Sequence, residues 1–277
     1  KKKKIKKMII CYFDHSQIKG IINAVSLKKK LVIRISKTNI WTSTRSSEDT
    51  LVAECNLVRS PNDVHTFDSE IAMCVKEEDI LKQLNAGKNG NITILTVLFV
   101  ENHHFTYKFQ HVNEQTEFRY DGSEYIGTVP DEEDDEVIFA DTPKGCKCSF
   151  PTTEFKLLLE KISTIEGVES TKKSVNFFVD STSNIFVQDA FPVRKYRFTY
   201  NTTNIGNQPP NATIQVGMDC TVKTDVFLSL KELKTICAAI PLSPFVIVDL
   251  AANALSSFTF FLENEKGNVR FRLAPKY

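Results

Sequence analysis

The chain has 277 residues, 42% of them hydrophobic, so it can bury the core of one large domain or of two ordinary ones. Its 35 basic and 34 acidic residues nearly cancel, which excludes a protein that binds nucleic acid through a strong overall positive charge. The sequence has no recognisable signal peptide and no apolar run that would span a bilayer, so we expect no membrane partner.

The cysteines give no sign of a metal centre. The chain has seven cysteines, an odd number, and most of them lie in apolar stretches of the sequence. This is typical of reduced, buried thiols in an intracellular protein. Cys146 and Cys148 form one close pair, and on a strand both would face the same side. Since no second cysteine pair and no histidine cluster supports a site there, we expect no metal and no cofactor.

The first half of the chain predicts two helices among strands. Asp14 begins a capped helix, whose apolar residues from Ile18 to Val25 recur at the spacing of one helical face. A second helix runs near Lys76 to Ala86 and stops at Gly87. Strands are predicted from runs rich in β-branched and aromatic residues at Leu31–Ser36, Asn39–Thr44, Leu51–Val58, Asn91–Val100 and Thr106–His111.

The second half predicts the same alternation. One helix begins at Pro151 and continues with Phe155, Leu158 and Leu159, and another runs near Ser229 to Ile240. Strands are predicted at Val175–Val179, Ile185–Asp189, Tyr196–Thr202, Thr213–Asp219, Phe245–Asp249, Ser257–Leu262 and Val269–Leu273. Few residues are identical between the halves, so the halves repeat the order of helices and strands (a repeat of plan) rather than the sequence.

An acidic segment separates the halves. Within residues 120–142, the run from Asp131 to Glu136 consists of carboxylates that repel one another and keep a segment solvated. We therefore predict an α+β fold of two similar domains, residues 8–119 and 143–277, each with two helices packed on antiparallel sheet. Residues 120–142 would connect them, and residues 1–7 would form a basic extension that is either a functional tail or an added segment.

Short motifs in the second half resemble a known family. The last strand ends in Leu273-Ala274-Pro275-Lys276, and Pro241-Leu242-Ser243 follows the last helix. The segment from Cys148 to Phe155 leads a strand through Pro151 into a helix. These features resemble the proliferating cell nuclear antigen (PCNA) family, the sliding clamps of DNA replication, and indicate a divergent or viral member. The resemblance implies a DNA clamp fold that closes into a ring, with a homotrimer as the expected assembly.

The resemblance also implies that the helices line a channel for double-stranded DNA. Lysine suits such a surface because it meets phosphates without fixing register, so the ring can slide. The expected channel residues are Lys19, Lys28, Lys29, Lys76, Lys82, Lys156, Lys161, Lys231 and Lys234. Acidic residues share these helices, and lysine is an ordinary solvated helix residue, so composition alone leaves both interpretations open.

A ring of identical subunits closes when one end of each subunit pairs with the other end of the next. By resemblance, the strand near Thr116–Tyr120 would meet the strand near Lys195–Asn201 of the neighbouring subunit. The expected interface residues are Phe118, Tyr120, Tyr196, Phe198 and Tyr200. Both segments alternate polar and aromatic residues as edge strands do, but the sequence equally allows each strand to lie inside a sheet.

Clamps of this family bind partners in a pocket beneath the connector, where a short helical turn inserts its apolar anchors. The matching positions are Ser43, Leu51, Tyr125, Ile126, Val129, Pro130, Pro241, Leu242, Leu273, Ala274 and Pro275. An alternative is that Tyr125 and Ile126 only pin the connector to the body. The chain departs from the family in Arg272, where an aromatic is common, in the lack of an acidic tail after Lys276, and in a long polar loop over residues 201–210.

The resemblance implies a protein that is not an enzyme but a processivity factor. It would encircle duplex DNA, recruit DNA polymerase and other proteins with clamp-binding motifs, and be opened by an ATP-dependent clamp loader, in the nucleus or a viral replication compartment. The sequence has no phosphate-binding loop, nucleophile elbow or dinucleotide-binding loop. Alternatives of the same fold are a subunit of a heterotrimeric checkpoint clamp and a monomeric viral processivity factor. A β-rich adaptor without a DNA role is an alternative of another class.

Overall fold

The computed structural model describes residues 7–27, 30–67, 69–100, 104–130, 146–163, 174–179, 184–189, 197–201, 219–220, 224–251 and 254–276. These residues divide into two compact units. Unit 1 holds the described residues of 7–47, 53–130 and 263–269, and unit 2 holds those of 48–52, 146–262 and 270–276. Each unit is described by itself.

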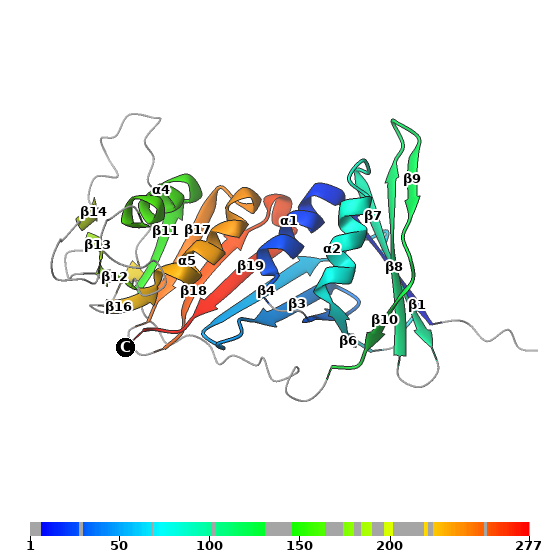
Figure 1. Cartoon of the computed structure of the whole chain (residues 1–277), viewed down its shortest axis with the longest axis horizontal. Helices are drawn as coiled ribbons and strands as arrows, with labels where there is room; N and C mark the ends of the chain where they lie inside the picture. Colours follow the sequence, from blue (N-terminus) through cyan, green and yellow to red (C-terminus); the bar gives the residue numbers. More distant parts are fainter. Residues whose placement is uncertain are drawn as a thin grey trace, which may run out of the picture. The chain divides into compact units, whose positions relative to one another are not determined.

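Unit 1 packs two helices on one face of an antiparallel sheet (Figure 1). Its elements are β1 (Met8–Asp14), α1 (His15–Val25), β2 (Lys30–Ile35), β3 (Asn39–Arg45), β4 (Leu51–Val58), β5 (Val64–His65), β6 (Ile71–Lys76), α2 (Glu77–Ala86), β7 (Ile92–Val100), β8 (His104–Asn113), β9 (Phe118–Asp121) and β10 (Tyr125–Thr128). The strand order is β4-β3-β2-β6-β10-β8-β7-β1-β5. β9 lies beside β10 along β8, pairing with residues 110–113 while β10 pairs with residues 104–107.

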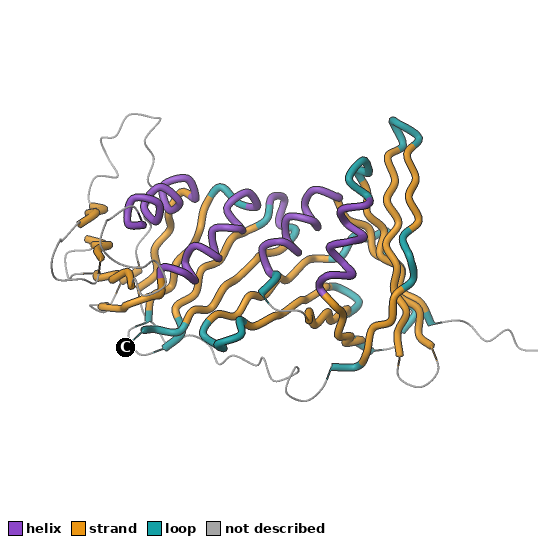
Figure 2. Tube along the Cα trace, in the orientation of Figure 1, coloured by secondary structure: helices purple, strands orange, loops and turns teal. Residues whose placement is uncertain are grey.

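Unit 2 also has two helices packed together, drawn in purple in Figure 2. Its elements are β11 (Cys146–Pro151), α4 (Thr152–Ser163), β12 (Ser174–Val179), β13 (Asn184–Asp189), β14 (Arg197–Asn201), β15 (Asp219–Cys220), β16 (Thr224–Ser229), α5 (Leu230–Ile236), η2 (Cys237–Leu242), β17 (Phe245–Leu250), β18 (Ser256–Phe261) and β19 (Gly267–Leu273), with the short turn η3 (Glu263–Glu265) before β19. One set of strands runs β15-β11-β17-β18-β19, and a separate sheet runs β14-β13-β12-β16.

The helices form where the sequence predicts them, except that the last one ends as an α-helix at Ile236 and continues as the 3-10 helix η2, which contains Pro241. The Asp14 carboxylate accepts a hydrogen bond from Gln17 N at 2.9 Å and caps α1, whose apolar face buries Ile18 and Ile21. α2 begins with three acidic residues, which suit the positive end of a helix dipole. In the described part of the chain, the predicted α+β class is confirmed, with four α-helices and antiparallel strand pairing.

The two units repeat one pairing scheme. β1 leads into α1 and pairs with β7 and β5, just as β11 leads into α4 and pairs with β17 and β15. β2 pairs with β3 and β6, as β12 pairs with β13 and β16, and β7 pairs with β8 as β17 pairs with β18. We call residues equivalent when they occupy the same register in this scheme. Asp14 is thus equivalent to Pro151, because they pair with Ile92 and Phe245 at the start of β7 and β17.

The structure adds strands that the sequence patterns did not delimit. β6 and β16 each run directly into a helix, and neither was among the predicted strands. Tyr125–Thr128, in the expected connector, forms β10 and belongs to the sheet of unit 1. Residues 131–142 of that connector lie outside the described residues, as does the predicted strand at residues 213–219 except for Asp219, which begins β15.

Candidate DNA-facing helices, partner site and subunit joint

The expected channel lysines lie mostly on exposed positions. Lys82, Lys156, Lys231 and Lys234 are exposed on helices, Lys76 is exposed immediately before α2, and Lys19 is half-buried on α1. Lys19 and Lys156 are equivalent, each five residues after Asp14 or Pro151. Lys161 lies on α4, although its side chain is outside the described part, and Lys28 and Lys29 lie outside the described residues.

Two of these lysines are held by surface ion pairs. Lys156 Nζ lies 3.8 Å from Glu160 Oε1, and Lys231 Nζ lies 3.6 Å from Glu48 Oε1. Exposed pairs of this kind contribute little to stability and are easily exchanged for another anion. Lys156 and Lys234 also converge on Cys237, where both oppose the burial that raises the pKa of that thiol to about 11. Glu160 acts on the thiol in the opposite sense, so lysines of both helices and a carboxylate of α4 surround Cys237.

The helix surface as a whole is nearly neutral. The helices carry Lys19, Lys82, Lys156, Lys161, Lys231 and Lys234 against Glu77, Glu78, Asp79, Glu154, Glu160 and Glu232. Helices with such a balance would neutralise few phosphates and release few counterions, so charge alone would hold DNA only weakly. A protein that held DNA with these helices would need a means other than charge.

The expected partner-pocket residues divide into exposed and buried sets. In unit 1, Ile126 is 68% exposed and Val129 is 49% exposed, whereas the Tyr125 ring stacks on Tyr107 with centroids 5.9 Å apart. Tyr125 therefore pins the strand to the sheet, whereas the side chain of Ile126 is exposed. Pro130 is half-buried, and Ser43 is buried in β3.

In unit 2, the C-terminal motif is fixed by backbone hydrogen bonds. Ala274 N donates to Thr50 O and Lys276 N donates to Phe227 O, each at 2.8 Å. Leu51 and Leu273 are buried core residues, so neither offers a surface to a partner. Pro241 is exposed, and Leu242, Ala274 and Pro275 are half-buried.

Both strands expected at the subunit joint lie at sheet edges. Among the described strands, β9 pairs with β8 alone and β14 pairs with β13 alone. Phe118 and Tyr120 lie in β9, where both are half-buried, and Phe198 and Tyr200 lie in β14. Tyr196 lies outside the described residues. Of the two arrangements that the sequence allowed, the described residues have the edge arrangement.

Unit 1 shows what covers the edge equivalent to that of β14. β14 is equivalent to β4, and within unit 1 Val58 N at the end of β4 donates to Lys266 O at 2.9 Å. Gly267 follows with φ 135°, and a Cβ there would lie 1.9 Å from Asn56 O. Only glycine allows the backbone to approach β4 so closely.

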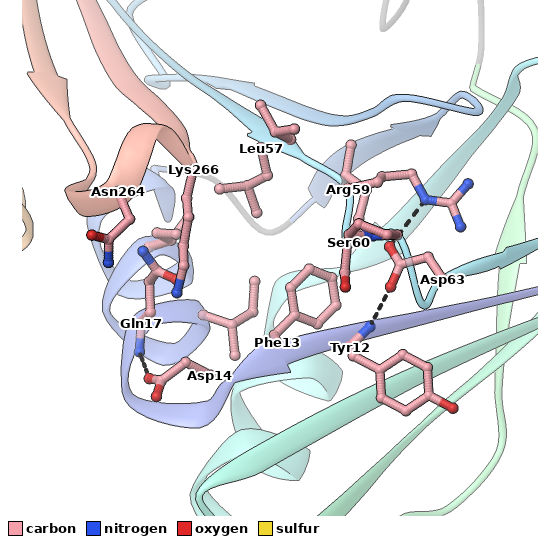
Figure 3. Close-up of a pocket in the computed structure, with 15 residues that line it drawn as sticks. Tyr12, Phe13, Asp14, Gln17, Leu57, Arg59, Ser60, Asp63, Asn264 and Lys266 are labelled. Carbon is pink, nitrogen blue, oxygen red and sulfur yellow. Dashed lines mark hydrogen bonds and ion pairs between the residues drawn. The ribbon is translucent and has the colours of Figure 1, made fainter.

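A cavity of about 360 Å³ opens in unit 1 between β1, α1 and β4 (Figure 3). Its apolar lining includes Ile18, Ile21 and Leu57. Its carboxylates have partners within the unit. Arg59 Nε lies 3.1 Å from Asp63 Oδ2 in a buried pair, and the Asp14 carboxylate accepts hydrogen bonds from Ser16 Oγ and Gln17 N, which together with the charge of Lys266 lower its pKa against the effect of burial. With its charges used internally, the cavity defines no ligand chemistry.

Unit 1 also buries a polar cluster of His15, Thr93, His111 and Gln83. Thr93 Oγ1 lies 2.8 Å from His15 Nδ1 and 2.9 Å from His111 Nδ1, and His111 Nε2 lies 3.1 Å from Gln83 O. A carbonyl only accepts, so His111 carries its proton on Nε2 and accepts from Thr93 through Nδ1. Thr93 must then accept from His15 Nδ1, which leaves the lone pair of His15 Nε2 buried without a partner among the described residues.

The polar cluster is poorly suited to positive charge. Burial lowers the pKa of His111 to about 4, with His15 acting in the same direction and the hydrogen bond to Gln83 O opposing it. Burial, aided by Lys19, also lowers the pKa of His15. His111 stacks on Tyr120 of β9 with centroids 5.8 Å apart, so the cluster lies directly behind the edge strand. Sequence reasoning missed this cluster, because its members are far apart along the chain.

Within the part of the chain that the structure describes, no group of three His, Cys, Asp or Glu residues is placed to hold a metal ion. None of the helices there is both long and apolar enough to cross a lipid bilayer. No protein-family model and no curated protein matches the chain. The likeness to sliding clamps therefore depends on the motifs around Pro151, Pro241 and Leu273–Lys276.

Proposed function

We propose that this chain is a DNA sliding clamp that assembles as a homotrimer of the PCNA type. The observation that carries the proposal is the repeated pairing scheme, in which each unit places two helices over antiparallel strands. Two like units in one chain supply the repeating element from which a ring of several subunits is built. The Leu-Ala-Pro-Lys motif supports the same family independently of the fold.

The strand edges support closure between copies. In unit 1, the residues that lead into β19 cover the edge of β4. β14 is the equivalent of β4. β9 and β10 together pair with β8, just as β19 pairs with the equivalent strand β18. By the same scheme, the edge of β14 that has no partner among the described strands would accept β9 of the next copy. This joint is heterologous, which is what a closed ring of identical subunits requires.

The near-neutral helices support holding by encirclement rather than by charge. Lysines such as Lys19 and Lys156 would touch phosphates without fixing register, so the clamp would slide. Duplex DNA would be bound irrespective of sequence, and an ATP-dependent loader, a separate protein, would open the ring. The chain would itself perform no bond chemistry and would act in the nucleus or in a viral replication compartment.

Partner recruitment would use exposed apolar side chains. Ile126 and Val129 are free to receive the apolar anchors of a clamp-binding motif from DNA polymerase or a repair protein. Tethering converts each re-encounter of polymerase with the primer end into an intramolecular event, which raises processivity through effective concentration.

The solution mass of the protein tests this proposal. Light scattering over a dilution series should give about three times 31.4 kDa. The variant Phe118→Asp, in the open edge strand β9, should reduce the mass to that of one chain. Phe99→Asp, at an exposed apolar position on β7, is the matched control and should leave it unchanged. A wild-type mass near 31.4 kDa throughout would contradict the homotrimer and favour a checkpoint-clamp subunit or a monomeric processivity factor.

A further inference from the structure

The strand register of unit 2 places two cysteines directly opposite each other. β15 is antiparallel to β11, with Cys146 opposite Cys220 and Lys147 opposite Asp219. The charge pair at the second position favours this register, because opposite charges across a strand pair attract. Directly opposite residues in antiparallel strands have Cα atoms about 4.5–5.5 Å apart, which is within the usual range for a disulfide.

Unit 1 shows how the equivalent edge is held without cysteine. Ile9 and His65 occupy the positions of Cys146 and Cys220 in the pairing of β1 with β5. β5 has two residues, yet its surroundings are heavily hydrogen-bonded. Thr66 N donates to Met8 O at 3.0 Å, and Arg59 Nη2 donates to Val64 O at 3.1 Å. In unit 1, polar contacts beyond the β1–β5 ladder therefore hold this two-residue strand.

We propose that Cys146 and Cys220 form a reversible disulfide that fastens β15 to β11. β15 is also two residues long, and its register offers a cysteine pair at the position that unit 1 secures with polar contacts. The inference depends on the pairing within unit 2 and does not rest on the proposed clamp function. It assigns a role to Cys146, which the sequence pattern grouped with Cys148.

The oxidant would be a small disulfide such as oxidised glutathione. One cysteine thiolate attacks it and forms a mixed disulfide, releasing one small thiol. The second cysteine thiolate then attacks the protein sulfur of that mixed disulfide and releases the other small thiol. The two protein thiols lose two protons and two electrons, which are recovered in the two small thiols, and excess small thiol reverses the reaction.

The neighbouring cysteines are poor competitors. Cys148 is fully buried, its Sγ lies 3.6 Å from Val248 O, and burial raises the pKa of its thiol. A thiol that is rarely ionised is a slow nucleophile. Cys237 is half-buried, and burial raises the pKa of its thiol to about 11. Cys237 is therefore a suitable control position.

Peptide mapping of the oxidised full-length chain tests the bond directly. The reduced protein is incubated with oxidised glutathione, remaining thiols are blocked with N-ethylmaleimide, and trypsin digestion follows without reduction. Cleavage after Lys144 and Lys147 separates Cys146 from Cys148. We expect the peptide of residues 145–147 to be joined to the peptide of residues 198–223, which contains Cys220. Recovery of Cys220 alkylated, or of Cys146 joined to any other cysteine, would overturn the proposal.

Thermal unfolding provides a second readout. Oxidation should raise the Tm by roughly 5–10 °C, since the bond closes a long loop, and a reductant should reverse the rise. Cys146→Ser and Cys220→Ser should each abolish the rise, whereas Cys237→Ser should retain it. All reduced proteins should unfold near the same temperature. A rise that persists in either Cys146→Ser or Cys220→Ser would show that another bond causes it.

Discussion

Beneath its helices, unit 1 buries His15, Thr93 and His111, whereas unit 2 has Thr152, Val246 and Phe260 at the equivalent positions. Gln83 of α2 is likewise equivalent to Ile236 of α5. The same pairing scheme therefore closes over a polar cluster in unit 1, whereas in unit 2 Thr152 donates to the Ser243 carbonyl and the other equivalent side chains are apolar.

This difference shows that the fold accepts either polar or apolar residues at these buried positions. Val246, Phe260 and Ile236 are completely buried, so the scaffold is compatible with an apolar core at these positions. The polar cluster keeps its hydrogen bonds only in one protonation state, and it leaves His15 Nε2 without a partner among the described residues. Since an unsatisfied buried polar atom costs about 1–3 kcal/mol, unit 1 carries a cost that the apolar equivalents in unit 2 avoid.

The largest effect should come from moving the polar residue into unit 2. Phe260→His removes a completely buried ring and inserts a polar one among apolar neighbours, so we expect a loss of about 3 kcal/mol in the free energy of unfolding. Urea denaturation measures it. The control is Phe260→Leu, which removes the ring without adding a polar atom and should cost less. Equal losses in the two variants would mean that polarity at this site is irrelevant.

Breaking the centre of the polar cluster should cost somewhat less. Thr93→Val preserves the shape but deprives both His15 and His111 of the hydroxyl at 2.8 and 2.9 Å. We expect a loss of about 2 kcal/mol, because two buried ring nitrogens lose their partner. Thr93→Ser keeps the hydroxyl and should lose less than half as much. If valine and serine behaved alike, the hydroxyl would have no part in stability.

The polar cluster should also make the protein sensitive to acid. The pKa of His111 is about 4 in the folded chain against an ordinary 6.5, so below pH 6.5 the unfolded chain binds the proton more readily. The contribution to stability is complete above pH 6.5 and is lost as the pH falls towards 4, with a slope of at most about 1.4 kcal/mol per pH unit per histidine.

The triple variant His15→Thr, Thr93→Val, His111→Phe gives unit 1 the residues of unit 2. Its unfolding free energy should fall less steeply than that of the wild type between pH 6.5 and 4.5, by about 1–2 kcal/mol over that interval. Chemical denaturation at several pH values measures both slopes. Parallel curves for the two proteins would exclude the histidines as the source of the acid sensitivity.

The smallest effect on stability should occur at Ile126. Because its side chain is 68% exposed, Ile126→Ser should change the free energy of unfolding by less than about 0.5 kcal/mol. Its neighbour Tyr125 is stacked on Tyr107, and Tyr125→Ser should cost more. A fluorescent clamp-binding peptide should nevertheless lose affinity for Ile126→Ser. Unchanged affinity would place the partner site elsewhere.

The sequence predicted what local spacing determines. The apolar spacing from Ile18 to Val25 and the cap at Asp14 specify α1, and the same spacing after Pro151 specifies α4. The repeat of plan also followed from the order of elements. The sequence did not predict which residues of the two halves are equivalent, because equivalent residues such as Ile9 and Cys146 have unlike side chains.

The functional groupings depended on contacts that spacing does not encode. His15 and His111 meet through Thr93 only once β1, β7 and β8 are paired, and the backbone positions of Cys146 and Cys220 are opposite each other only through the register of β15. Sequence motifs drew Leu51 and Leu273 into the partner pocket, but the fold buries both. A motif identifies a position in a family pattern, whereas the exposure of its side chain depends on packing.

Retention on DNA of defined topology tests the central proposal most directly. The protein is threaded onto linear duplexes anchored to beads at one end, the free ends are then blocked with streptavidin, and the beads are washed at high salt. A ring should remain after the wash and be released when a restriction enzyme cuts the duplex, because encirclement does not depend on charge. A protein that elutes with salt alone, whether or not the ends are blocked, would contradict the sliding clamp.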